Sequence, residues 1–185
     1  MSQSDDAPSR REFLGLAACA MAGVGVLAAA APFVMASGPG QMDDTASVVD
    51  VDLGDMLPGT QKIVSWQGKP VIIRHRTAED MASARGDDAA QGLIDRARDA
   101  DRVRGSVIDG QAAPQWLVLV GVCAHLGCMP GPARDSQNTG GWVCPCHGSR
   151  FDSSGRVRSG PAARNMAVPP YRFVTPTRIR IGEEA

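Results

Sequence analysis

The chain has 185 residues, enough for one domain with an appendage. Hydrophobic residues make up 43% of it, which is ample for a core, and a formal net charge of −1 gives no broad basic field for binding nucleic acid. Cys19 stands alone in an apolar run, whereas the other four of the five cysteines fall between residues 123 and 146. Whether those four are metal ligands, a disulfide or both depends on the redox compartment.

An export signal and a membrane anchor are predicted at the N-terminus. Arg10 and Arg11 precede the uncharged run 13–36, which as a helix would span about 36 Å against a hydrocarbon core of roughly 30 Å. Such a pair resembles the signal of the bacterial pathway that exports folded, cofactor-loaded proteins. A removable signal peptide is the alternative, with small residues for cleavage before Ser37, but the run is long for one. We expect a retained anchor in the inner membrane, with 1–12 cytoplasmic and the rest periplasmic.

The segment 37–47 consists largely of Gly, Pro, Asp and Ser and is predicted to be a flexible tether. A mainly β domain is predicted over 48–185. Short β-prone runs lie at 47–53, 61–66, 69–76, 115–122, 141–143, 149–151 and 177–181. The run 61–66 alternates polar and apolar residues, as a half-buried strand does, and the continuously apolar 116–120 favours a central strand. We therefore expect an antiparallel β-sandwich.

Two further segments of the domain are predicted from their charge pattern. Residues 77–85 are predicted to form a helix with Thr77 as its N-cap and acidic residues in its first turn. Residues 87–105 carry dense charge without periodicity, which indicates a surface excursion that is partly helical. His75 lies between two arginines that would repel a metal ion, so we expect a surface strand histidine.

The candidate metal ligands form two short boxes. The first, GVCAHLGC at 121–128, and the second, VCPCHGS at 143–149, together contain Cys123, His125, Cys128, Cys144, Cys146 and His147. Six donors are too many for one tetrahedral zinc. Four cysteines would suit a plant-type iron–sulfur cluster; two cysteines and two histidines would suit either structural zinc or a Rieske 2Fe–2S cluster. Because each box contributes one histidine, the spacing favours the use of both.

The boxes C-A-H-L-G-C and C-P-C-H-G-S resemble those of the Rieske iron–sulfur subunits of the cytochrome bc1 complex (ubiquinol–cytochrome c reductase). The likeness extends to the twin-arginine anchor, GKPVIIRHRT at 68–77, WLVLVGV at 116–122 and SGRVRSGPA at 154–162. It implies a cluster-binding subdomain at about 121–163, inserted in the sandwich. It also implies one 2Fe–2S cluster, its ligands and a disulfide: Cys123 and Cys144 on one iron, His125 and His147 on the other, and Cys128 bonded to Cys146.

The resemblance further implies an oxidoreductase subunit that transfers electrons. His147 would hydrogen-bond quinol in the pocket of cytochrome b, with His125 as its fellow ligand, and the head would swing on its tether to reduce cytochrome c1. The complex would be dimeric. Imidazole ligands donate less negative charge than thiolates, so Rieske potentials lie at roughly −150 to +300 mV, against about −400 mV for plant-type clusters.

Residues near the boxes also carry expectations from the resemblance. Ser149 matches a serine that donates a hydrogen bond at the cluster, and Leu126 is expected at the exposed docking tip. Phe151 stands where the quinol-oxidising family commonly has tyrosine, which predicts a less oxidising cluster. The loop 160–163 keeps only part of the family's Gly-Pro-Ala-Pro sequence.

Three other functions are compatible with parts of the sequence. An exported Rieske subunit of another oxidoreductase, such as an arsenite oxidase, would share the leader and the boxes. A zinc-stabilised binding module would use the same donors without redox activity. A thiol–disulfide oxidoreductase is the weakest alternative, because no C-x-x-C motif follows the strands.

Overall fold

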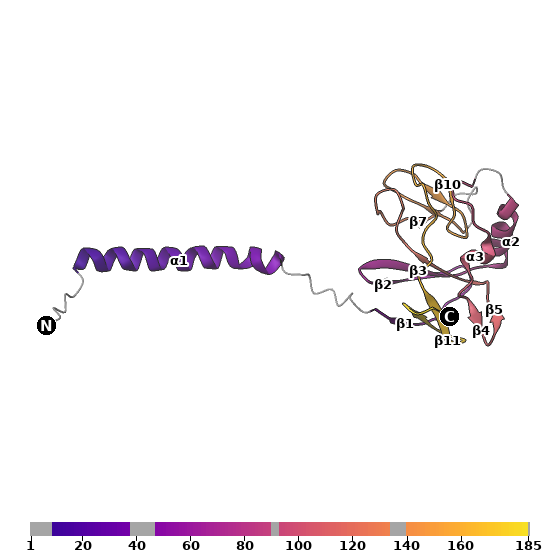
Figure 1. Ribbon diagram of the computed structural model, residues 1–185, viewed down its shortest axis with the longest axis horizontal. Helices are drawn as coiled ribbons and strands as arrows, with labels where there is room; N and C mark the ends of the chain where they lie inside the picture. Colours follow the sequence, from indigo (N-terminus) through magenta and orange to yellow (C-terminus); the bar gives the residue numbers. More distant parts are fainter. Residues whose placement is uncertain (1–8, 38–46, 90–92, 134–139, 185) are drawn as a thin grey trace. The chain divides into compact units, whose positions relative to one another are not determined.

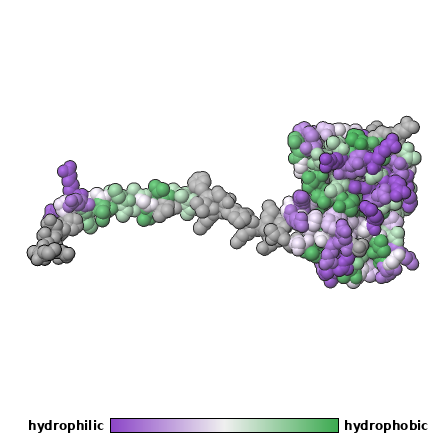
Figure 2. Space-filling model, viewed as in Figure 1, coloured by the Kyte–Doolittle hydropathy of each residue, from purple (hydrophilic) through white to green (hydrophobic). Residues whose placement is uncertain are grey.

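A computed structural model describes residues 9–37, 47–89, 93–133 and 140–184 in two compact units, 1–42 and 43–185 (Figure 1). The first unit contains α1 (Arg10–Ser37), whose first turn is closed by a capping box between Ser9 and Glu12. Most of its apolar side chains that the structure describes are exposed on the helix surface (Figure 2), and Leu16 is 76% exposed. The part Arg10–Ala31 is long and apolar enough to cross a membrane, a test that a signal sequence also passes. Most of the predicted tether lies outside the described residues.

In its described residues the second unit contains three antiparallel sheets and one small hairpin, together with short helices. The first sheet contains, in order, β1 (Val49–Asp52), β12 (Arg178–Ile181) and β11 (Tyr171–Thr175). The second contains β2 (Gln61–Trp66), β3 (Lys69–His75) and β6 (Trp116–Val120). The third contains β10 (Val157–Ser159), β9 (Arg150–Phe151), β8 (Trp142–Val143) and β7 (Gly131–Pro132). The hairpin pairs β4 (Val107–Ile108) with β5 (Gln111–Ala112).

The second sheet separates two hydrophobic cores. Along β6, Val118 packs into the core shared with the first sheet, whereas Leu117 and Leu119 pack into the core shared with the third sheet. On β3, Ile72 and Ile73 divide in the same way, because successive side chains point to opposite faces of a sheet. The prediction of an antiparallel sandwich with an added subdomain is therefore confirmed.

The prediction that 116–120 forms a central strand is wrong. The strand β6 lies at the edge of its sheet, next to β3, which is the central one. All five residues of β6 are nevertheless buried, because each face of the strand is covered by a different core. The continuous apolar run therefore reports burial on both faces and not the position of the strand in the sheet.

The helix predicted at 77–85 is present as α2 (Ala78–Gly86). The Thr77 hydroxyl accepts a hydrogen bond from the amide of Asp80 at 3.1 Å, and the Asp80 carboxylate accepts one from the amide of Thr77 at 3.1 Å. This reciprocal pair satisfies two amides that helix geometry leaves without partners.

Replacing Thr77 with alanine is expected to lower the free energy of unfolding by about 1 kcal/mol, because the Asp80 amide loses its acceptor. Thermal unfolding of the variant should shift down by a few degrees relative to the wild type. Thr177→Ala, at an exposed turn position, is the control and should leave the transition unchanged. Equal midpoint temperatures of unfolding for the two variants would contradict the role of Thr77 as the cap.

The segment 87–105 is partly helical as predicted, with the 3-10 turn η1 (Asp87–Ala89) and α3 (Asp99–Arg102). Its description as a surface excursion is wrong, because Asp99 and Arg102 are buried. Asp99 pairs with the fully buried Arg76 at 2.6 Å. The neighbouring His75 is half-buried and stacks on Trp116, with ring centroids 4.2 Å apart.

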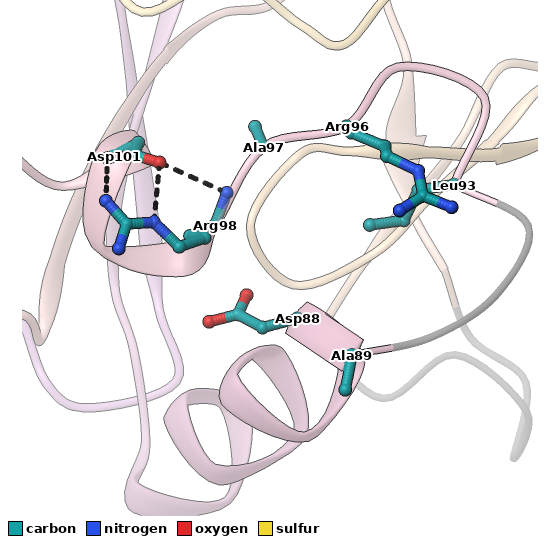
Figure 3. A pocket seen from close by; sticks show the side chains of 7 residues that line it. All are labelled: Asp88, Ala89, Leu93, Arg96, Ala97, Arg98 and Asp101. Carbon is teal, nitrogen blue, oxygen red and sulfur yellow. Dashed lines mark hydrogen bonds and ion pairs between the residues drawn. The ribbon is translucent and has the colours of Figure 1, made fainter.

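A pocket lies along this segment (Figure 3). Its lining residues are Asp88, Ala89, Leu93, Arg96, Ala97, Arg98 and Asp101. The Arg98 guanidinium turns to Asp101 at 3.1 Å and does not converge with Arg96 on a common point. None of the lining residues belongs to the two cysteine–histidine boxes, so the pocket is separate from the candidate metal centre.

Candidate metal centre

The two boxes fold into turns with the same hydrogen bonds. In each, the carbonyl oxygen of the first cysteine, Cys123 or Cys144, accepts a bond of 3.0 Å from the amide of a glycine four residues later. The amide of the same cysteine donates a bond of 2.8 Å to the carbonyl five residues later. The glycines, Gly127 and Gly148, have φ of 83° and 73°, a left-handed conformation that glycine adopts without steric cost.

A disulfide joins the two turns. It connects Cys128 to Cys146, the pairing that the family resemblance implies. Cys123 and Cys144 remain free thiols and are 1% and 2% exposed. The other free cysteine, Cys19, belongs to α1.

The two histidines of the boxes meet at the same place. Their ring centroids are 4.6 Å apart and the ring planes lie at 87°. His147 is exposed, whereas His125 is half-buried. Nδ1 of His125 is buried and has no hydrogen-bond partner within the described part of the chain. A buried polar atom of this kind needs a partner, and a metal bond at Nδ1 would supply one.

These donors fit a 2Fe–2S group with two thiolate and two imidazole ligands. The sulfur atoms of Cys128, Cys144 and Cys146 lie within 4.8 Å of one another and on distance alone also form a candidate site. Two of those three are bonded to each other, so they offer no thiolate. The geometry leaves the buried thiols and the two imidazoles as donors, a set that zinc would accept as well.

Comparison with known proteins separates these possibilities. Residues 95–172 match the model of the Rieske [2Fe-2S] domain, and 1–36 match that of the ubiquinol–cytochrome c reductase Fe-S subunit TAT signal. The ubiquinol–cytochrome c reductase iron–sulfur subunit of Blastochloris viridis is 44% identical, over 98% of both chains. Those of Bradyrhizobium diazoefficiens and Rickettsia typhi are each 43% identical, over 98% and 94% of this chain and 98% and 93% of theirs.

The chain belongs to the Rieske iron–sulfur subunit family of ubiquinol–cytochrome c reductase. Its cofactor is therefore a Rieske 2Fe–2S cluster, and the zinc-module alternative is wrong. The signal match, taken with the apolar helix α1, indicates an exported protein with a membrane anchor.

The second box packs against the loop that follows β10. The amide of Ala162 donates to the Ser149 hydroxyl oxygen at 3.1 Å, and Ser149 is fully buried. Gly160 has φ of +92°, and a Cβ on it would lie 2.5 Å from the Cα of Ser149. Although the loop departs from the family sequence at its end, its glycine lets it pack directly on the second box. Leu126 is 70% exposed, as expected for the tip.

Arg156, whose burial was not predicted from the sequence, fixes the hairpin between β9 and β10. Nε of Arg156 donates to Asp152 at 2.7 Å, Nη1 pairs with Asp88 at 2.5 Å, and Nη2 donates to the carbonyl of Ala84 at 2.7 Å. Burial alone would lower the pKa of Arg156, but the two carboxylates outweigh it and raise that pKa. Arg156 therefore stays charged and ties the hairpin to α2 and η1.

Phe151 lies fully buried in the core that also contains Cys123 and Cys144. Replacing it with tyrosine is expected to raise the midpoint potential, because a hydroxyl that donates to a ligand sulfur stabilises the reduced cluster. One such bond of about 1 kcal/mol corresponds to about 40 mV in a one-electron couple. A redox titration followed by circular dichroism measures it. Phe173→Tyr, in the other core, is the control, and an unchanged midpoint in Phe151→Tyr would contradict the expectation.

Proposed function

We propose that the chain is the electron-transfer subunit of a quinol–cytochrome c reductase. It takes one electron and one proton from quinol bound at cytochrome b and passes the electron to cytochrome c1, within a dimeric complex. The observation that carries the proposal is the exposed His147 ring, with its centroid 4.6 Å from that of His125, in two turns that also contain two buried free thiols, in a chain of this family. Only an exposed ligand can meet a substrate held by another protein.

Each residue of the site has a distinct role in this proposal. Cys123 and Cys144, both buried, would hold one iron, and His125 and His147 would hold the other. When bound, the 2Fe–2S cluster supplies a one-electron acceptor with a potential set partly by its neutral imidazole ligands. His147 is exposed, so the ring nitrogen that does not bind the cluster would lie at the surface, where it would accept a hydrogen bond from the quinol hydroxyl and then its proton. The disulfide keeps the two turns from separating during these steps.

Docking and topology follow from the exposed parts of the chain. The Leu126 side chain, apolar and exposed beside His125, is suited to an apolar partner surface, which we assign to cytochrome b. We infer that α1 stays in the bacterial inner membrane as a single span, with the Rieske domain on the periplasmic side. Motion of this domain between the two cytochromes would use the predicted tether at 37–47.

The first test is low-temperature electron paramagnetic resonance of the ascorbate-reduced protein from its native host, with metal analysis. A rhombic signal of low average g and two irons per chain are expected. A silent sample is repeated with dithionite, because Phe151 lowers the expected potential. Zinc without iron would overturn the proposal. Co-purification with b- and c-type haem tests the partners and separates this function from that of another exported oxidoreductase.

A further inference from the structure

Cys144 lies beside the disulfide as well as at the metal centre. Its sulfur and those of Cys128 and Cys146 form one group within 4.8 Å, and Cys128 packs against the hydrophobic core that contains Cys144. Cys123, the other free thiol of the domain, is not a member of this group. Three neighbouring sulfurs that share one bond can exchange it, provided that the free sulfur is available as a thiolate.

We propose that Cys144, when it is not bonded to iron, isomerises the disulfide, so that iron ligation selects the Cys128–Cys146 pairing. This inference rests on the proposed ligand set. The Cys144 thiolate attacks the sulfur of Cys128, a Cys128–Cys144 bond forms, and the Cys128–Cys146 bond breaks. Cys146 leaves with the electron pair and takes a proton from water in place of the one that Cys144 gave up. The exchange is redox-neutral and needs no other reactant.

The exposure of the three cysteines sets the direction of attack. Cys146 is exposed, so its departing thiolate is solvated, and Cys128 is half-buried on the side of the core where Cys144 lies. Attack on Cys146 would instead join two cysteines separated by one residue. The Cys128–Cys144 product still cross-links the two turns but removes a cluster ligand, so a chain that isomerises can no longer bind iron at that position.

The export signal agrees with this requirement. A twin-arginine signal serves proteins that fold and load their cofactor before they cross the membrane. Cys144 is then bonded to iron before the chain meets an oxidising compartment, where Cys128 and Cys146 are the thiols left to pair. Cluster first and disulfide second is the order that yields the observed pairing.

Two full-length variants test the proposal as a matched pair. Cys123→Ser and Cys144→Ser each remove one proposed ligand of the same iron, but only Cys123→Ser keeps the attacking sulfur. Both are purified reduced and oxidised in one glutathione buffer, then acid-quenched, alkylated and mapped by mass spectrometry. Cys123→Ser should form the Cys128–Cys144 bond, whereas Cys144→Ser should keep Cys128–Cys146. The fraction of chains with a pairing other than Cys128–Cys146 should be at least about tenfold larger in Cys123→Ser than in Cys144→Ser.

Several outcomes would overturn the inference. One is a Cys123→Ser chain with only the Cys128–Cys146 bond. Another is an equal fraction of non-native disulfides in both variants, with Cys123 disulfide-bonded in Cys144→Ser. Unfolded chains would give that result. Wild-type chain stripped of iron by a chelator gives a test without substitution: the Cys128–Cys144 bond should appear as iron leaves, and iron loss without it is contrary evidence. If Cys144→Ser retains two irons, the ligand assignment of the proposed function fails, whatever the disulfide map.

Discussion

The substitution Arg156→Met is expected to lower the free energy of unfolding by about 3–5 kcal/mol, the usual effect of removing one partner of a buried ion pair. The side chain of Arg156 is fully buried and that of Asp152 is 5% exposed. Without the guanidinium, the buried Asp152 carboxylate keeps the hydrogen bonds from the amides of residues 154 and 156 but loses the side chain that pairs with it. Asp88, 28% exposed, loses this ion pair as well and keeps the hydrogen bond from the amide of Asp99 at 2.8 Å.

Thermal unfolding of the oxidised, cluster-loaded chain measures this effect. At a fixed scan rate the midpoint temperature of unfolding of Arg156→Met should be lower than that of the wild type by at least about 10 °C. Arg158→Met is the matched control: Arg158 pairs with Asp87 at 3.6 Å, with side chains 33% and 31% exposed, so its loss should cost less than about 1 kcal/mol. Similar shifts for the two variants would show that Arg156 has no special role in holding the hairpin.

Features specified by neighbouring residues could be predicted from the sequence. The cap at Thr77 needs only its own hydroxyl and the amide three residues later, and the structure begins α2 there. The run 61–66 coincides with β2. The boxes belong to this class too, since each turn closes within six residues and its glycine stands at the position where φ is positive.

Features that depend on distant partners could not be predicted. Arg76 is one of the two arginines beside His75 in the sequence, yet it is buried, and its partner Asp99 lies 23 residues away in a segment without periodicity. The same holds for Arg156 and Asp88, which are 68 residues apart. Nothing local marks which charge of a charged segment will be buried, because burial depends on how sheets and segments pack.

The candidate site was predictable in its chemistry but not in its surroundings. The count of cysteines and histidines indicated a metal centre, and a family resemblance assigned ligands and disulfide. Cys123 follows β6, a strand whose two faces contact different cores. This position could not be predicted without the order of the strands in the sheets. The sequence likewise showed the loop 160–163 only as a partial match to the family, and the close contact of its glycine with Ser149 could not be predicted.

Ser149→Ala is expected to lower the midpoint potential of the cluster by about 65–130 mV. The Ser149 hydroxyl oxygen accepts from the amide of Ala162, which leaves its hydrogen to donate toward the cluster that the proposed ligands Cys144 and His147 would hold. A bond to a charged acceptor is worth about 1.5–3 kcal/mol, and 59 mV is a tenfold change in a one-electron couple. Because the reduced cluster carries more negative charge, the donor stabilises it, and its loss favours the oxidised form.

A redox titration of the full chain, followed by the Rieske circular dichroism signal, tests this shift. Ser159→Ala, an exposed serine at the end of β10, is the matched control and should keep the wild-type midpoint. Iron content must equal that of the wild type, so that a changed potential is not a changed occupancy. A midpoint in Ser149→Ala that stays the same or rises would mean that the buried hydroxyl only supports the loop through Ala162. Potential control would then have to come from backbone amides of the two turns.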